Sequence, residues 1–180
     1  MTLLETLPLP YKNSDLTPVM SAKTIDYHYT HLAKNYAINY NSNKGNPRFN
    51  KAGNFLHNIF FAQFKKPFSG DSNGSTQNHN ANINTPHGPS AEIIKKHFGS
   101  FDKFKETLKT SALKIEGSGW IYLSTDGSIK IIHNHAIKRD ILLLIDWWEH
   151  AWALDYQSNK ADYFDNIWRI INWDFVNSKL

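Results

Sequence analysis

An apolar strand that ends in an acid and a histidine most limits what this chain can fold into. The residues from Ile141 to Ile145 are all apolar, which is typical of a buried strand. The string Asp-Trp-Trp-Glu-His-Ala follows directly and brings Asp146 and His150 to the end of that strand. A carboxylate and an imidazole together suit iron, manganese or zinc, so the pattern predicts a metal site. From these residues alone, the alternative is that Asp146 caps a helix and His150 packs in the core.

The composition excludes other kinds of site. The 180 residues include no cysteine, which rules out disulfide scaffolds, thiol catalysis and cysteine-type zinc sites. The net charge of +4 is modest and the lysines are scattered, so we expect no nucleic-acid binding. No stretch approaches the length of a membrane span, and the N-terminus lacks an apolar signal core. We therefore expect a soluble, cytoplasmic protein without a membrane partner.

Helical patterns dominate the first part of the chain. Ser21 can cap a helix that runs to Asn41, because apolar and aromatic residues recur there at helical spacing. A second helix is predicted from about Phe49 to Lys65, ending before Pro67. Gly45-Asn46-Pro47 breaks the chain between them, so we expect an antiparallel helical hairpin with a short loop.

The segment from Ser69 to Thr85 contains five asparagines and is poor in large apolar residues, which is typical of a linker. We place a domain boundary at its end. Residues 1–85 are predicted to form an N-terminal helical hairpin domain with an Asn-rich linker. Residues 86–180 are predicted to form a C-terminal α+β domain.

The second half alternates helix and strand signals. One short helix is predicted from Pro89 to Gly99, and another from Ser100 to about Ile115. Asp126-Gly127 separates two β-rich runs, 120–124 and 129–134, and indicates a hairpin. Residues 141–145 add a third strand, and residues 159–176 read as one final helix. The predicted fold class is α+β: an N-terminal antiparallel helical hairpin followed by a three-stranded antiparallel sheet flanked by helices.

Several motifs, in this order and over nearly the whole chain, resemble the iron/manganese superoxide dismutase family. The segment from Asp146 to Ala151 is similar to that family's Asp-x-Trp-Glu-His-Ala metal signature. The other matching strings are Leu7-Pro8-Leu9-Pro10-Tyr11, Tyr27-His28-Tyr29 with Tyr36, Phe55-Leu56-His57-Asn58-Ile59-Phe60-Phe61, Phe98-Gly99-Ser100-Phe101, Gly117-Ser118-Gly119-Trp120 and Ile171-Asn172-Trp173-Asp174-Phe175-Val176.

The resemblance implies one redox-active iron or manganese ion per subunit. Its ligands would be His28, His57, Asp146 and His150, and its reaction would convert superoxide to dioxygen and hydrogen peroxide. The resemblance also implies a homodimer, or a tetramer of dimers, in which Glu149 contacts a metal-binding histidine of the partner subunit. The first alternative is a structural protein that kept the fold and lost the reaction. The second is a different metal-bound oxidoreductase or hydrolase on similar ligands.

Two further catalytic residues follow from the resemblance. The family places a tyrosine at the substrate gate, which matches Tyr36; a buried core tyrosine is the alternative. Some members use a glutamine on the second ligand helix to hydrogen-bond the metal-bound solvent, but that position is Gly53 here. Others supply a Gln or His from the end of the second strand, which matches His135. His133 is the competing choice, because residues two apart on a strand share a face.

The sequence also departs from the family pattern. A histidine and a tyrosine that pair across the subunit interface in the family correspond to Leu32 and Ala153, which puts the usual gate network in doubt. Three further departures are Leu56 for an asparagine, Phe61 for a tryptophan and Gln157 for an arginine. The remaining histidines match no functional position of the family and are predicted to lie on the surface: His31, His79, His87 and His97.

Overall fold

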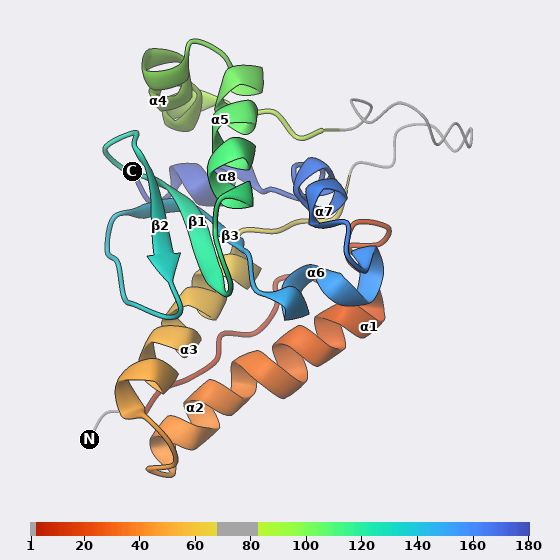
Figure 1. Ribbon diagram of the computed structural model, residues 1–180, viewed down its shortest axis with the longest axis vertical. Helices are drawn as coiled ribbons and strands as arrows, with labels where there is room; N and C mark the ends of the chain where they lie inside the picture. The colour runs from red at the N-terminus through yellow and green to blue at the C-terminus, as the bar shows by residue number, and fades with distance from the viewer. Residues whose placement is uncertain (1–2, 68–82) are drawn as a thin grey trace.

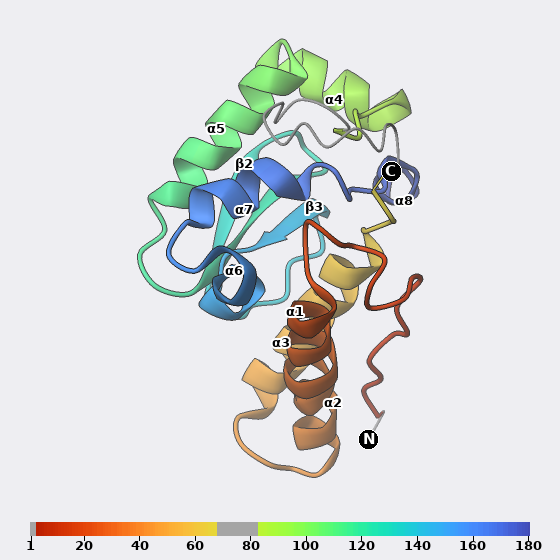
Figure 2. The ribbon, with the colours of Figure 1, turned by 90° about the vertical axis from the view of Figure 1, so that its right-hand side faces the viewer.

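The computed structural model describes residues 3–67 and 83–180. A helical hairpin forms one end of the molecule, and a small sheet with its flanking helices forms the other (Figures 1 and 2). The predicted α+β fold class is confirmed. Most of the predicted linker, residues 69–82, lies outside the described residues, and the domain boundary at residue 85 stays a prediction.

The first predicted helix is a single helical stretch of three segments: α1 (Ala22–Ile25), η1 (Asp26–Ala33) and α2 (Lys34–Asn41). Ser21 caps it as predicted, because its hydroxyl accepts from the N–H of Thr24 at 3.1 Å. The central segment η1 is a π-helix, a wider turn that is rare and often marks a functional site. No residue pattern in this segment predicts the wider turn.

The second helix, α3 (Pro47–Ala62), runs antiparallel to α2 and completes the predicted hairpin (Figure 1). It starts two residues earlier than expected, because Asn46 caps it by accepting from the N–H groups of Arg48 and Phe49 at 2.9 and 3.1 Å. Proline at the first helical position is compatible with this start, since its missing N–H would have no partner there.

The sheet has the order β2-β1-β3 and is antiparallel throughout, as predicted. Its strands are β1 (Gly119–Ser124), β2 (Ile129–His133) and β3 (Ile141–Asp146). Every residue of β1 and β3 is buried, which explains the continuous apolar run before Asp146. Trp120 pairs with Asp146 on one side and with Ile132 on the other. The register therefore brings the start of β1 beside the end of β3.

Helices cover the sheet on its two sides. α4 (Gly88–Phe98) and α5 (Phe101–Leu113) match the two predicted helices, and α5 packs against β1. α3 and α8 (Trp173–Asn177) pack against β3, while α7 (Lys160–Ile167) packs on α5 (Figure 2). α6 (Glu149–Tyr156) leaves β3 and lies against α1.

The prediction of one final helix over residues 159–176 is wrong. The chain forms α7 and α8, and the residues between them turn to meet the end of α3. Ile171 forms a β-bridge with Phe64, and the N–H of Asn172 donates to the carbonyl of Gln63 at 2.8 Å. These backbone groups pair with a segment a hundred residues earlier, so the local helical pattern could not reveal the break.

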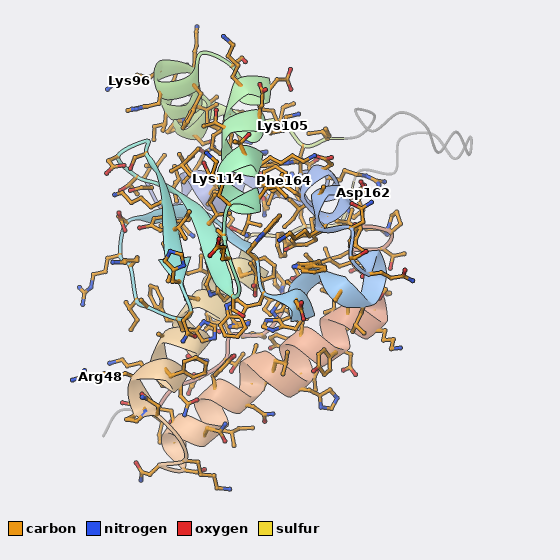
Figure 3. The ribbon with its side chains drawn as sticks, in the orientation of Figure 1. Arg48, Lys96, Lys105, Lys114, Asp162 and Phe164 are labelled. Atoms are coloured by element: carbon orange, nitrogen blue, oxygen red, sulfur yellow. The ribbon has the colours of Figure 1, made fainter. Side chains whose placement is uncertain are left out.

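Charged side chains lie at well-separated places on the surface. Arg48 projects from α3 at one end of the molecule and Lys96 from α4 at the other (Figure 3). Among the helices in residues 3–67 and 83–180, none has the length and hydropathy needed to cross a bilayer.

Candidate metal centre

Four side chains from separate elements meet where the hairpin touches the sheet. His28 comes from η1, His57 from α3, Asp146 from the last position of β3, and His150 from the first turn of α6. One ligand atom from each lies within 4.8 Å of those from the other three. These are the four residues that the sequence predicted as a set.

The carboxylate of Asp146 lies at the centre of this cluster. Its Oδ2 is 3.2 Å from Nε2 of His28, 3.4 Å from Nε2 of His150 and 3.7 Å from Nε2 of His57. The side chains of His28, His57 and Asp146 are fully buried, and His150 is nearly so.

Those four facing atoms have no hydrogen-bond partner among the described residues. Each buried polar atom left without a partner costs about 1–3 kcal/mol, so a cluster of four needs an explanation. A cation shared by three imidazole nitrogens and one carboxylate oxygen would satisfy all of them. The residues present therefore fit an iron, manganese or zinc ion.

Hydrogen bonds outside the cluster turn the ligand atoms inward. Nδ1 of His57 lies 2.7 Å from the carbonyl oxygen of Gly53, so Nδ1–H donates there and the Nε2 lone pair faces the cluster. Oδ1 of Asp146 accepts from the backbone N–H of Trp148 at 2.9 Å, which leaves Oδ2 for the histidines. The hydroxyl of Tyr163 donates to the Asp146 carbonyl at 3.1 Å and anchors the end of β3.

Burial sets the charge state that metal ligation requires. It lowers the pKa of His28 to about 4 and that of His57 well below its usual value, so both imidazoles are neutral at pH 7. Burial by itself would raise the pKa of Asp146, but the nearby His150 and His28 outweigh it and lower that pKa. His28 and His57 thus offer neutral imidazoles, and Asp146 a carboxylate, without prior loss of protons.

The description "iron/manganese superoxide dismutases, C-terminal domain" belongs to a family model that matches residues 86–179. This match covers more than half of the chain. The chain belongs to the iron/manganese superoxide dismutase family.

Curated members of the superoxide dismutase family match it over almost its full length. "Superoxide dismutase [Fe]" of Bacteroides fragilis is 35% identical, with 96% of each chain covered. "Superoxide dismutase [Mn/Fe]" of Porphyromonas gingivalis is 32% identical, over 97% of this chain and 98% of that one. "Superoxide dismutase [Fe]" of Escherichia coli K12 is 33% identical, over 96% and 95%. Iron and manganese both occur in these names.

Tyr36 and His135 lie together beside the cluster of this superoxide dismutase family member. Nε2 of His135 is 3.0 Å from the Tyr36 hydroxyl. The centre of the His57 ring lies 5.2 Å from that of Tyr36 and 5.8 Å from that of His135. Burial raises the pKa of Tyr36 to about 12, assisted by the charge of Asp146, and lowers the pKa of His135 to about 4. His133, the competing choice, is exposed on β2. The contact of either histidine with a metal-bound solvent stays a prediction.

Aromatic side chains enclose the cluster. Trp120 lies edge-on to His57 at 5.0 Å, Phe61 lies 4.8 Å from His28, and Trp148 stacks on His135 at 4.7 Å. All three lie in the strings that resemble the superoxide dismutase family. Phe60, 5.5 Å from His28, was missed; the helical spacing from His57 could have indicated it.

The sequence also left the role of Gly53 unexplained. The Tyr36 ring lies directly over it, and a Cβ at position 53 would be 2.9 Å from that ring. A glycine inside a helix is unfavourable by itself, so its presence in α3 was the available signal. Gly53 therefore provides space for Tyr36 as well as a carbonyl for His57.

A surface cavity of about 800 Å³ opens beside His150 and is lined by Glu149, Ala153 and Gln157 among others. Glu149 is exposed in the single chain. Leu32 and Ala153 are both partly exposed, while Leu56 and Phe61 are buried in the core. His31, His87 and His97 are exposed as predicted, and His79 lies outside the described residues.

Proposed function

We propose that this chain is a superoxide dismutase with one iron or manganese ion per subunit, held by His28, His57, Asp146 and His150. The supporting observation is the convergence of three imidazole nitrogens and one carboxylate oxygen that have no other partner within residues 3–67 and 83–180. Such an ion supplies one-electron redox chemistry, by which two superoxide anions become dioxygen and hydrogen peroxide.

The four ligating residues give this site a net positive charge when it is loaded. Three neutral imidazoles add no charge and Asp146 adds one negative charge, so a divalent or trivalent ion is only partly neutralised. A positive, aromatic-walled site favours the approach of a small anion such as superoxide. Trp120, Phe61 and Trp148 limit the access of water and of larger reductants.

Tyr36 and His135 handle protons at the edge of the site. Formation of hydrogen peroxide from superoxide takes up one electron and two protons, so a donor must stand close to the reacting oxygen. The Tyr36 hydroxyl is protonated at neutral pH, since burial raises its pKa further above the usual value of 10. His135 holds that hydroxyl in place through the hydrogen bond of 3.0 Å.

A catalytically inactive structural protein is the alternative. A protein that had lost the reaction would be expected to lose the residues that bind metal, but all four candidate ligands are retained here. The substitutions at Leu32 and Ala153 change the surroundings of the site without touching its ligands.

We propose that a second copy of the chain covers the cavity beside His150, with Glu149 reaching a histidine of the partner subunit. The exposure of Glu149 on the rim of that cavity supports this arrangement. A tetramer of dimers is the larger form of the same proposal, and the cytoplasmic location stays a prediction.

The test is metal content and dismutase rate in protein made with iron and manganese both supplied. His28→Ala should lose the ion and the activity. His31→Ala is the matched control, because it lies three residues away on η1 with a side chain that is 64% exposed. Full occupancy of His28→Ala, or a metal-loaded wild type without dismutase activity, would contradict the proposal.

A further inference from the structure

α3 presents apolar side chains on two opposite faces. Gly53, His57 and Phe61 lie on the face towards the metal centre. Phe55 and Ile59 each follow two residues later, about 200° further around the helix, and both are only partly buried. We call these two residues the outer stripe. A surface helix needs one apolar stripe and carries polar residues opposite to it, so the outer stripe calls for a separate explanation.

The outer stripe lines a surface cavity of about 370 Å³. Leu4 and Leu7 reach it from the N-terminal arm (residues 3–11), Ile137 from the loop after β2, and Phe175 from α8. Seven of the ten side chains that line the cavity consist of hydrocarbon alone. Sites for small molecules are cavities of roughly 300–1,000 Å³ with mostly apolar walls and a few polar groups. This cavity therefore has the size and character of a ligand site.

Asparagine side chains of α3 hold the arm against the cavity. Asn58 accepts from the N–H of Leu7 at 2.9 Å and donates to the carbonyl of Glu5 at 3.0 Å. Asn54 donates to the hydroxyl oxygen of Thr6 at 3.2 Å. Both amides border the cavity, but they are engaged with the arm. The apolar wall is thus already in place, which reduces the ordering that a ligand would have to impose.

The charge at the edge of the cavity is positive. Lys51, one turn before Phe55 on α3, is the charged residue among the described residues that line it. Lys51 takes part in none of the ion pairs that lysines form among the described residues. Lys138 and Arg139 follow the lining residue of the loop and are exposed. Glu5 on the arm is also exposed, and it does not line the cavity.

We propose that this cavity binds a medium-chain aliphatic carboxylate, with the tail along the outer stripe and the carboxylate at Lys51. Burial of the tail supplies the driving force, and the ammonium group of Lys51 selects the sign of the head group. A strongly polar ligand would lose its water in the cavity and gain few hydrogen bonds. The proposal is independent of the proposed dismutase function, since none of the four candidate metal ligands lines the cavity.

The test is isothermal titration calorimetry on the full-length, metal-loaded chain, with each ligand kept below the concentration at which it forms micelles. Decanoate should bind saturably with one molecule per chain. From hexanoate to decanoate, each added methylene should tighten binding by up to about fourfold, because each extends the buried apolar surface. Decylammonium has the same tail with a positive head group, and it should show no saturable binding.

Four variants relate the binding to this cavity. Lys51→Met should weaken decanoate binding roughly two- to fivefold, which corresponds to the loss of an exposed ion pair. Lys96→Met is the matched control, because it removes a lysine at the other end of the molecule (Figure 3). Ala62→Trp fills the cavity and should abolish binding. Leu7→Glu changes a side chain that is 52% exposed, so the variant should fold, and its negative charge should weaken decanoate binding.

The proposal is overturned if decanoate does not bind saturably, or if decylammonium binds equally well. It is also overturned if decanoate binds equally to the wild type, Lys51→Met and Leu7→Glu, because the carboxylate would then sit elsewhere, for example at the metal centre. If Ala62→Trp does not fold, Leu7→Glu decides in its place. A change in oligomeric state of ligand-free Ala62→Trp in sedimentation experiments would show that a second copy of the chain occupies the cavity, and would overturn the proposal as well.

Discussion

At the scale of single residues, Gly53 decides where the Tyr36 ring can lie. A Cβ at this position would come within 2.9–3.0 Å of three atoms of that ring, closer than real contacts allow. The carbonyl of the same residue orients His57. One residue in α3 thus controls a proposed ligand and a proposed proton donor without having a side chain.

We expect Gly53→Ala to displace Tyr36 while leaving the metal bound. The variant should lower the dismutase rate and leave metal content unchanged, because the new methyl group faces the tyrosine and the His57 carbonyl partner is retained. The control is the same change in a Tyr36→Ala background. There the clash is gone, and alanine should stabilise α3 by about 0.5–1 kcal/mol, as is usual for Gly-to-Ala in a helix. Full activity of Gly53→Ala would show that the ring is not held in this position.

The buried histidines predict that acid destabilises the metal-free chain. Burial lowers the pKa of His28 and of His135 to about 4, from a usual value of 6.5. Between these values the unfolded chain binds more protons, so the free energy of unfolding falls as the pH drops from 6.5 towards 4. Above 6.5 both states are neutral, and these two groups add no pH dependence.

Urea unfolding of the metal-free chain at several pH values measures this effect. His135→Gln removes one of the titrating groups, so stability should fall less steeply with acid, by up to about 1.4 kcal/mol per pH unit. His31→Gln changes an exposed imidazole and should follow the wild-type curve. Equal steepness in the wild type and in His135→Gln would contradict the expectation.

At the scale of elements, the side chain of Gln63 replaces a missing fourth strand. β3 lies at the edge of the sheet, and its Leu144 is fully buried. The N–H of Leu144 donates to Oε1 of Gln63 at 3.0 Å, and Nε2 of Gln63 donates to the Leu144 carbonyl. An amide is suited to this task because it offers one acceptor and a donor. It holds β3, and with it Asp146, against the end of α3.

Gln63→Leu should destabilise the fold by roughly 2–6 kcal/mol. The change leaves a buried N–H and a buried carbonyl unpaired, each at about 1–3 kcal/mol. Chemical denaturation of the metal-free variant measures the loss. Gln63→Glu is the more conservative variant: it can accept from Leu144 but cannot donate to it, so it should also lose stability. Wild-type stability in both variants would show that the edge of β3 is satisfied in another way.

At the scale of the whole molecule, the candidate ligands join the hairpin to the sheet. His28 and His57 belong to the hairpin, while Asp146 and His150 follow β3 (Figure 1). An ion bound by all four should stabilise the folded chain by mass action, by about 2.7 kcal/mol at a hundredfold excess over its Kd. Calorimetry should show a higher Tm with manganese than without it. In His57→Ala the added metal should leave Tm unchanged.

If the subunits associate through Glu149, a change that weakens the oligomer should also lower the dismutase rate. Removal of one partner from a buried charged pair typically costs about 3–5 kcal/mol, so Glu149→Ala should shift the oligomer towards monomer in sedimentation experiments and lower the dismutase rate. Glu92→Ala is the control, because Glu92 is an exposed acid on α4. A wild-type chain that is monomeric at micromolar concentration would contradict the proposed interface.

Local patterns determined much of this protein. Apolar periodicity, the caps at Ser21 and Ser100, and the Asp126-Gly127 turn were sufficient for the helical hairpin, for α4 and α5, and for the sheet, because these depend on neighbouring residues. The order of several family motifs indicated the four candidate ligands as a set.

Long-range contacts decided the rest. The break between α7 and α8 depends on Phe64 and Gln63, and the π-helix that carries His28 had no sequence signal. The choice of His135 over His133 could not be made from the strand pattern. The tertiary structure places His135, and not the exposed His133, against Tyr36 and Trp120, because the course of the chain after β2 is set by contacts with other elements.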